Sequence, residues 1–191
     1  MKRVLPILIA LGAAIWLTTY SVETAPAPKP VPPPVVQAED PDAAFLELAI
    51  PFVGRWEGLR LEAYLDPVGI PTVCYGETKG VKLGDKYTKA ECDAMFAREL
   101  LAYRGGVHRA LTAETLARRL PVTRDVAYSS LGYNIGIGAV SKSTAVKRLN
   151  AGDVPGGCDA ITWWDKAGGK VLRGLTLRRG EEYDLCMVGV R

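Results

Sequence analysis

The chain has 191 residues, 48% of them hydrophobic, which is enough to bury one substantial core. Its net charge of +3 is too small to indicate nucleic-acid binding, although a mildly basic protein is drawn to anionic surfaces. A single histidine, His108, and the lack of a G-x-S-x-G sequence argue against a histidine-rich metal site and a Ser-His-Asp triad. We therefore expect one folded domain with an N-terminal appendage, monomeric, with no metal and no cofactor.

Residues 1–24 have the pattern of a membrane segment. Lys2 and Arg3 precede a charge-free run over residues 4–22, which as a helix would span roughly 28 Å, about the width of a bilayer core. The basic start favours a cytoplasmic N-terminus and an exported remainder. A cleaved signal peptide is the alternative, but its one Ala-x-Ala candidate, residues 25–27, is followed by proline. We predict an uncleaved single span in the inner membrane.

Residues 25–41 form a predicted linker. Its APAPKPVPPP stretch favours extended polyproline II and could reach about 31 Å at roughly 3.1 Å per residue. A spacer between membrane and domain explains this composition without a partner that binds the prolines. Pro6 and Gly12 in the preceding run make that segment weakly hydrophobic, so its hold on the membrane is predicted to be marginal.

The folded domain is predicted over residues 42–191. It begins with a helix that has Asp42 as its N-cap, is kinked or restarted at Pro51, and ends near Glu57. Two short β-prone pieces then flank the turn signal of residues 66–69, which predicts an antiparallel hairpin. Asp66 would lie at the turn and Thr72 on the returning strand.

Helices dominate the rest of the predicted domain. A capping-box sequence runs from Thr88 to Glu91, and apolar residues recur behind it at helical spacing until Gly105 and Gly106 break the chain. Further helices are predicted over residues 124–135, 144–150, 157–166 and 177–188, the last with Thr176 as its N-cap. The sum is an α+β domain, a small lobe with a β-hairpin followed by a larger helical lobe.

Two carboxylates are placed to act on a glycosidic bond. Cleavage needs an acid that protonates the leaving oxygen and usually a second carboxylate that activates water or stabilises charge on the sugar. Glu57 at a helix end and Asp66 at a hairpin turn could face each other across a cleft. Their spacing alone is weak evidence, because most acidic pairs are merely solvated.

The residues around this pair resemble the phage lysozyme family, glycoside hydrolase family 24. Its signature places Asp or Cys nine residues after Glu and Thr six residues further on, and Glu57, Asp66 and Thr72 keep both intervals. The resemblance runs from about residue 43 to the end of the chain and departs at Glu77, where the family motif has His. It implies a lysozyme-like fold with the active-site cleft between the two lobes.

The resemblance also implies an activity. The protein would be an endolysin that hydrolyses the β-1,4 bond between N-acetylmuramic acid and N-acetylglucosamine in bacterial peptidoglycan, for host lysis. Glu57 would be the general acid, and Asp66 with Thr72 would position and activate a water for an inverting attack. Glu57 would then need burial or a negative neighbour to stay protonated, whereas Asp66 would need a polar setting to stay ionised.

Aromatic and polar residues of the helical lobe are further candidates. Tyr133 and Asn134 resemble the family's pair at the cleft, where a sugar face can stack and an N-acetyl group can be hydrogen-bonded. Packing is the alternative for Tyr133, because an aromatic in a helical apolar pattern is usually in the core. We assign Trp163 and Trp164 to packing.

The N-terminal segment resembles the signal-anchor-release elements of one branch of the family. By that resemblance the protein is exported uncleaved, held inactive at the host inner membrane, and released to the periplasm when a holin or pinholin depolarises the membrane. The segment has no cysteine, so its release cannot work through attack of an anchor thiol on a disulfide of the domain.

An even number of cysteines in a chain predicted to be exported indicates two disulfides. The cysteines are Cys74, Cys92, Cys158 and Cys186, which allow three pairings. Sequence proximity and the family resemblance favour Cys74 with Cys92 and Cys158 with Cys186. Buried free thiols are the alternative.

Two other functions are compatible with parts of the sequence. A lytic transglycosylase also uses a catalytic glutamate on peptidoglycan, but it needs no water-activating Asp and yields an anhydro sugar. A non-enzymatic membrane-anchored protein that binds the cell wall would explain the anchor, the spacer and the basic charge. It would not explain the spacing of Glu57, Asp66 and Thr72.

Overall fold

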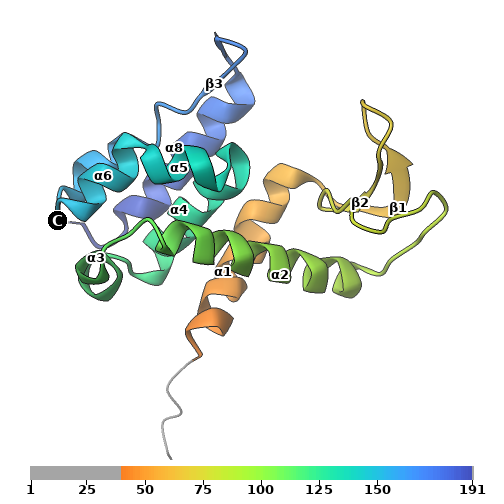
Figure 1. The fold of residues 1–191 in the computed structure, drawn as a ribbon, viewed down its shortest axis with the longest axis horizontal. Helices are drawn as coiled ribbons and strands as arrows, with labels where there is room; N and C mark the ends of the chain where they lie inside the picture. The colour runs from red at the N-terminus through yellow and green to blue at the C-terminus, as the bar shows by residue number, and fades with distance from the viewer. Residues whose placement is uncertain (1–39, 191) are drawn as a thin grey trace, which may run out of the picture. The chain divides into compact units, whose positions relative to one another are not determined.

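A small β-containing lobe and a larger helical lobe make up residues 40–190, the part of the chain that the computed structural model describes (Figure 1). The predicted membrane segment and nearly all of the predicted linker lie outside these residues. None of the helices within residues 40–190 is both long enough and apolar enough to cross a bilayer.

The elements follow one another with short connections. The helices are α1 (Pro41–Glu57), α2 (Lys89–His108), α3 (Ala113–Arg118), α4 (Val122–Ile135), α5 (Ile137–Lys142), α6 (Thr144–Asn150), α7 (Val154–Asp159) and α8 (Arg173–Met187). The strands are β1 (Arg60–Leu65), β2 (Pro71–Cys74), β3 (Lys166–Ala167) and β4 (Lys170–Val171), which form two separate antiparallel hairpins. The predicted α+β class is confirmed.

Helix α1 begins two residues earlier than its predicted cap. Asp40, not Asp42, is the N-cap: its carboxylate accepts a hydrogen bond of 2.9 Å from the backbone N–H of Asp42, and Pro41 occupies the first turn. The helix continues through Pro51 to Glu57 as one element, so the predicted restart is wrong. Pro51 lies on the exposed face, where the carbonyl that loses its N–H partner can be hydrated.

The predicted hairpin is confirmed. Tyr64 pairs with Thr72 and Leu65 with Pro71, and the register shifts further along, where Arg60 pairs with Cys74. The turn closes through a hydrogen bond of 3.0 Å from the N–H of Gly69 to the carbonyl of Asp66. This register puts Asp66 at the turn and Thr72 on β2, as expected.

Helix α2 has the predicted capping box at Thr88 and Glu91, but it does not end at its glycines. It runs through Gly105 and Gly106 to His108. Gly106 is buried against α5, where a Cβ atom would come within 2.6 Å of the Cδ1 atom of Ile137. The glycine therefore serves close packing between helices and does not break α2.

Helix α4 is the centre of the helical lobe, and its buried residues pack against α1, α2 and α8. The lobe's core includes Val107, Leu131, Leu149 and Ile161, all fully buried. Helices α4 and α6 match the predicted ranges closely, whereas the short helices α3 and α5 were not predicted. Their six residues each offer too few turns for a periodic pattern to stand out.

Two predicted helices near the C-terminus are placed differently. The helix expected over residues 157–166 is α7, which begins and ends earlier than predicted. It begins after the N-cap Asp153, whose carboxylate accepts a hydrogen bond of 2.9 Å from the N–H of Gly156, and it ends at Asp159. Residues 166–171 form the β3–β4 hairpin instead. Helix α8 begins at Arg173 and has no side-chain cap, so Thr176 lies inside it and is not its N-cap.

The two tryptophans differ in environment. Trp164 packs against the helical core, as assigned. Trp163 is 52% exposed, and the guanidinium of Arg148 lies 5.2 Å from its ring centroid, so the packing assignment is wrong for Trp163.

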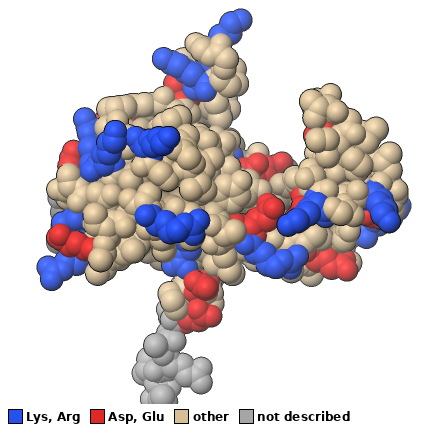
Figure 2. Space-filling view, in the orientation of Figure 1, with Lys and Arg blue, Asp and Glu red and all other residues tan. Residues whose placement is uncertain are grey.

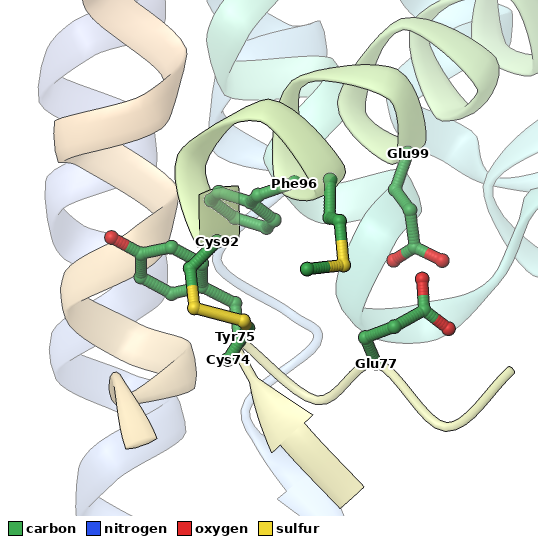
Figure 3. A pocket seen from close by; sticks show the side chains of 7 residues that line it. Cys74, Tyr75, Glu77, Cys92, Phe96 and Glu99 are labelled. Atoms are coloured by element: carbon green, nitrogen blue, oxygen red, sulfur yellow. A yellow bond between two sulfur atoms is a disulfide. The ribbon is translucent and has the colours of Figure 1, made fainter. Parts of the chain in front are cut away.

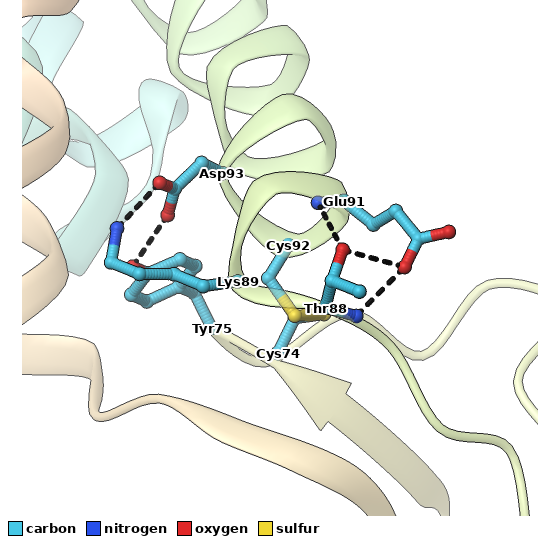
Figure 4. Close-up of a disulfide and its surroundings, with 7 residues drawn as sticks. All are labelled: Cys74, Tyr75, Thr88, Lys89, Glu91, Cys92 and Asp93. Atoms are coloured by element: carbon cyan, nitrogen blue, oxygen red, sulfur yellow. Dashed lines mark hydrogen bonds and ion pairs between the residues drawn. A yellow bond between two sulfur atoms is a disulfide. The ribbon is translucent and has the colours of Figure 1, made fainter.

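Both predicted disulfides are present. Cys74–Cys92 joins β2 to α2, and Cys158–Cys186 joins α7 to α8. Figure 4 shows the first bridge beside the capping box of α2 and beside Tyr75, whose hydroxyl donates to Asp93 over 2.8 Å. Each bridge lies within one of the two hydrophobic clusters of the domain.

Candidate active site

Glu57 ends α1, and Gly58, at φ +74°, turns the chain out of the helix there. The Glu57 side chain is 21% exposed, and its Oε1 atom accepts a hydrogen bond of 2.8 Å from Nη1 of Arg178 on α8. The helix therefore presents this carboxylate at the base of the small lobe with one oxygen held by a guanidinium.

The partner of Glu57 differs in charge from the expected one. A general acid was expected to need burial or a negative neighbour, and the group in contact is the cation Arg178. Arg178 is itself 4% exposed and is held from behind by Glu182, which is fully buried on the same helix. Sequence reasoning assigned no role to Arg178 or Glu182, because charged residues three and four apart on a helix usually mark a solvated face.

Asp66 is fixed by its own turn. Its Oδ1 atom accepts hydrogen bonds from the backbone N–H groups of Val68, at 2.9 Å, and Ile70, at 2.8 Å. This is the polar, hydrogen-bonded setting that was expected for Asp66. Both bonds use Oδ1, so they leave Oδ2 available for another partner.

Thr72 is buried next to this turn, with 4% exposure. Its hydroxyl donates a hydrogen bond of 3.0 Å to the carbonyl of Ile70, the residue whose N–H binds Asp66. One peptide segment thus orients both side chains. The hydroxyl oxygen keeps its lone pairs and can still accept a hydrogen bond.

The surface is hollowed between the helical lobe and the small lobe, and acidic side chains gather at the base of this notch (Figure 2). Helix α1 ends, and β1 begins, at the junction of the lobes (Figure 1). Among the described residues, Glu57 makes no hydrogen bond to Asp66 or Thr72. The structure thus pairs Glu57 with Arg178, and Asp66 with Thr72 through Ile70.

Tyr133 is half-buried in the seam between α4 and α2. Its ring packs edge-on against Phe96, with centroids 5.6 Å apart, and against Tyr103 at 4.8 Å. Burial raises the pKa of the Tyr133 hydroxyl, which donates a hydrogen bond of 3.3 Å to Glu99. Asn134, by contrast, is exposed near the end of α4 and free to meet a ligand.

Glu77 replaces the histidine of the family motif, and it faces a second carboxylate (Figure 3). Its side chain points toward Glu99 of α2, across a small pocket that also contains the Cys74–Cys92 bridge. Burial, and then the negative charge of Glu77, raise the pKa of Glu99. A histidine in this place would meet Glu99 as a partner, whereas Glu77 meets it as a like charge.

His108 has a structural position. Its Nε2 atom lies 2.8 Å from Oδ1 of Asp125, a buried residue of α4 that also accepts from Arg104. His108 thus joins the end of α2 to α4. Within residues 40–190, no group of three or more His, Cys, Asp or Glu side chains is arranged to hold a metal ion.

The fold and the Glu57 region define a lysozyme-type enzyme, and comparisons with known proteins agree. The phage lysozyme family model matches residues 54–182. A SAR-endolysin of Bacteriophage PS119 is 38% identical over 134 residues, covering 70% of this chain and 77% of the relative. A SAR-endolysin of Enterobacteria phage PA-2 is 37% identical over 134 residues, covering 70% and 78%.

A solved structure shows the same fold. The endolysin from Escherichia coli O157:H7 phage FAHEc1 is 32% identical, with a TM-score of 0.65, and the match covers 81% of this chain and 97% of that one. The chain belongs to the phage lysozyme family. It is accordingly a glycoside hydrolase that acts as a peptidoglycan-degrading endolysin, so the non-enzymatic alternative falls away.

Proposed function

We propose that the enzyme cleaves the β-1,4 bond between N-acetylmuramic acid and N-acetylglucosamine with inversion at the anomeric carbon. Glu57 protonates the leaving oxygen, and Asp66 with Thr72 holds and activates the attacking water on the opposite face of the sugar. The supporting observation is the fixed orientation of all three side chains: Glu57 by Arg178, and Asp66 and Thr72 by the backbone of Ile70.

The hydrogen bonding suits these roles. Arg178 engages Oε1 of Glu57, so Oε2 can carry the proton toward the substrate. The bonds to Oδ1 of Asp66 leave Oδ2 as the base for a water, and the Thr72 hydroxyl can accept a second hydrogen bond from that water. Asn134 and the exposed edge of Tyr133 contact the sugar chain.

The test is a lysis assay on chloroform-permeabilised Gram-negative cells. Glu57→Gln is expected to lower the rate by roughly 10³-fold or more while the protein stays folded, because only the proton donor is lost. Glu62→Gln is the matched control, since Glu62 is an exposed residue of the neighbouring strand. A Glu57→Gln protein with activity within tenfold of the parent would remove Glu57 from the role, and Asp66→Asn is expected to be similarly severe.

Product chemistry separates hydrolysis from the transglycosylase alternative. A hydrolase adds one water to each cleaved bond and yields a reducing sugar, whereas a transglycosylase yields an anhydro sugar of lower mass. Mass spectrometry of the released fragments decides between the two. Early NMR spectra of the products would show the α-anomer first if the reaction inverts configuration.

We also propose the domain organisation and localisation implied by the N-terminus. Residues 1–24 act as an uncleaved signal-anchor, residues 25–39 as a linker, and residues 40–191, which begin with the cap of α1, as the catalytic domain. The protein is held at the inner membrane and is released to the periplasm when a holin or pinholin depolarises the membrane. It works as a monomer. Support comes from the sequence pattern and from relatives that bear the name SAR-endolysin.

Fractionation of cells before and after an uncoupler tests the release. The expected soluble species has the mass of the uncleaved chain, and replacing Gly12, Ala13 and Ala14 by leucine should keep it in the membrane. A soluble species that begins near residue 25 would instead mean a cleaved signal peptide. Size-exclusion chromatography with light scattering would check the monomeric state.

A further inference from the structure

A buried charged cluster lies directly behind Glu57. Oε1 of Glu182 accepts hydrogen bonds from three groups: the hydroxyl of Ser130 at 2.6 Å, Nε of Arg178 at 3.2 Å and Nη2 of Arg179 at 2.9 Å. Glu182 is fully buried, and both arginines are at most 4% exposed. Three ionisable side chains are therefore held in the core between α4 and α8.

Filling a core with charged side chains is energetically unfavourable. Taking charges out of water is unfavourable, and well-packed apolar residues of similar volume often stabilise a protein as much or more. The hydrogen bond from Nη1 of Arg178 to Glu57 connects the cluster to the active site. This geometry indicates a role beyond packing.

The shape of the guanidinium makes the coupling specific. Nε of Arg178 points to Glu182, and Nη2 points to the carbonyl and hydroxyl of Ser130 at 3.3 Å each. With these two directions fixed, the planar group has no freedom in where Nη1 points. Glu182 and Ser130 thereby decide where Arg178 holds the carboxylate of Glu57.

We propose that Glu182 is a positioning residue for the reaction, one that fixes Arg178 and sets the charge facing Glu57. The inference rests on the proposed function of Glu57 as the proton donor. Glu182 does not touch the substrate in this scheme. It acts through Arg178.

Counting the charges near Glu57 predicts the direction in which the pH profile of the reaction should move. Burial raises the pKa of the Glu182 carboxyl, whereas Arg179, Ser130 and Arg178 favour its ionised form. With Glu182 ionised, the two guanidiniums less this one carboxylate leave one net positive charge. Tyr133 on α4 also lies close enough to feel the charge of Glu57, and burial raises the pKa of its hydroxyl, so it stays neutral. Removing the charge of Glu182 therefore raises the net positive charge next to Glu57, and removing the charge of Arg179 lowers it.

The test measures lysis against pH for the full chain purified in detergent. Glu182→Gln should move the alkaline limb of the profile down by about one pH unit, a roughly tenfold loss at a fixed pH on that limb, with KM unchanged. Arg179→Gln should move the limb up. Glu181→Gln, at the next position on α8 but paired with Arg55 on the surface, should match the parent.

An alkaline limb that stays in place in both Glu182→Gln and Arg179→Gln overturns the proposal, whatever their absolute rates. If Glu182→Gln fails to fold, Arg179→Gln decides: an alkaline limb that moves up supports the proposal, and a limb that stays or moves down overturns it. If both fail, Ser130→Ala decides, since it removes a single hydroxyl: a kcat at least threefold lower with unchanged KM supports the proposal, and a parental kcat overturns it. An active Glu57→Gln protein would instead refute the proposed function itself.

Discussion

Replacing Glu77 by Gln is expected to stabilise the folded protein at neutral pH. Glu77 points at Glu99, whose pKa is raised by burial and then by the charge of Glu77 (Figure 3). Both side chains are only partly buried, so solvent screens their repulsion, and a gain of about 0.5–1 kcal/mol is reasonable. Gln can still accept the 2.7 Å hydrogen bond that Lys79 N–H gives to Glu77.

The effect of Glu77→Gln on stability depends on pH. A carboxyl group whose pKa is higher in the folded than in the unfolded state contributes stability below its ordinary, unfolded pKa, and this contribution is lost as the pH rises through the folded value. The repulsion between Glu77 and Glu99 therefore exists above that range and vanishes when both are protonated. Glu77→Gln should stabilise near pH 7 and have almost no effect near pH 3.

Thermal unfolding at the two pH values provides the assay. For a domain of this size the gain corresponds to about 1–4 °C in Tm at pH 7. Glu62→Gln is the control, because Glu62 pairs with Lys86 and its loss should not stabilise the protein. An equal Tm shift at pH 3 and pH 7 would show that the effect is not electrostatic. Glu77→His should stabilise further wherever the imidazole is charged.

Three further changes have defined outcomes. Replacing Cys158 and Cys186 by serine frees a chain segment of 28 residues and should lower the free energy of unfolding by about 3–4 kcal/mol in urea titrations. Gly157→Ala should destabilise by about 1–3 kcal/mol, since its Cβ would lie 2.8 Å from the Tyr128 hydroxyl and 3.2 Å from two backbone atoms, whereas Gly138→Ala meets no atom within 4 Å and should not. Tyr133→Phe should keep lysis within threefold of the parent, because the ring that packs at the seam remains; a loss as large as that of Glu57→Gln would show that the hydroxyl itself is needed.

Local chemistry predicted much of the fold. The capping box of Thr88 and Glu91 and the turn at Asp66 are decided by residues within a few positions of each other, and both were predicted. Gly106 was misread because its neighbour Ile137 belongs to a later helix. The start of α8 was misplaced because that helix has no capping side chain to mark it.

The candidate site likewise contains residues that local sequence predicted and residues that it did not. Glu57, Asp66 and Thr72 were found through intervals in a short stretch of sequence. Arg178 contacts Glu57 across 121 residues of chain, and no local pattern predicts such a contact. Its role emerges only when α4 and α8 pack and bury the cluster around Glu182.

The disulfide connectivity has a consequence for biogenesis. Ribosomes make the chain from its N-terminus, so Cys74 and Cys92 both exist before Cys158 is synthesised, and each cysteine has its native partner as its nearest neighbour in order of appearance. An oxidant that joins cysteines in the order in which they emerge makes the native pairs directly. The two other pairings require Cys74 or Cys92 to wait for the C-terminal third of the chain. Oxidation in that order needs no reshuffling of mispaired bonds.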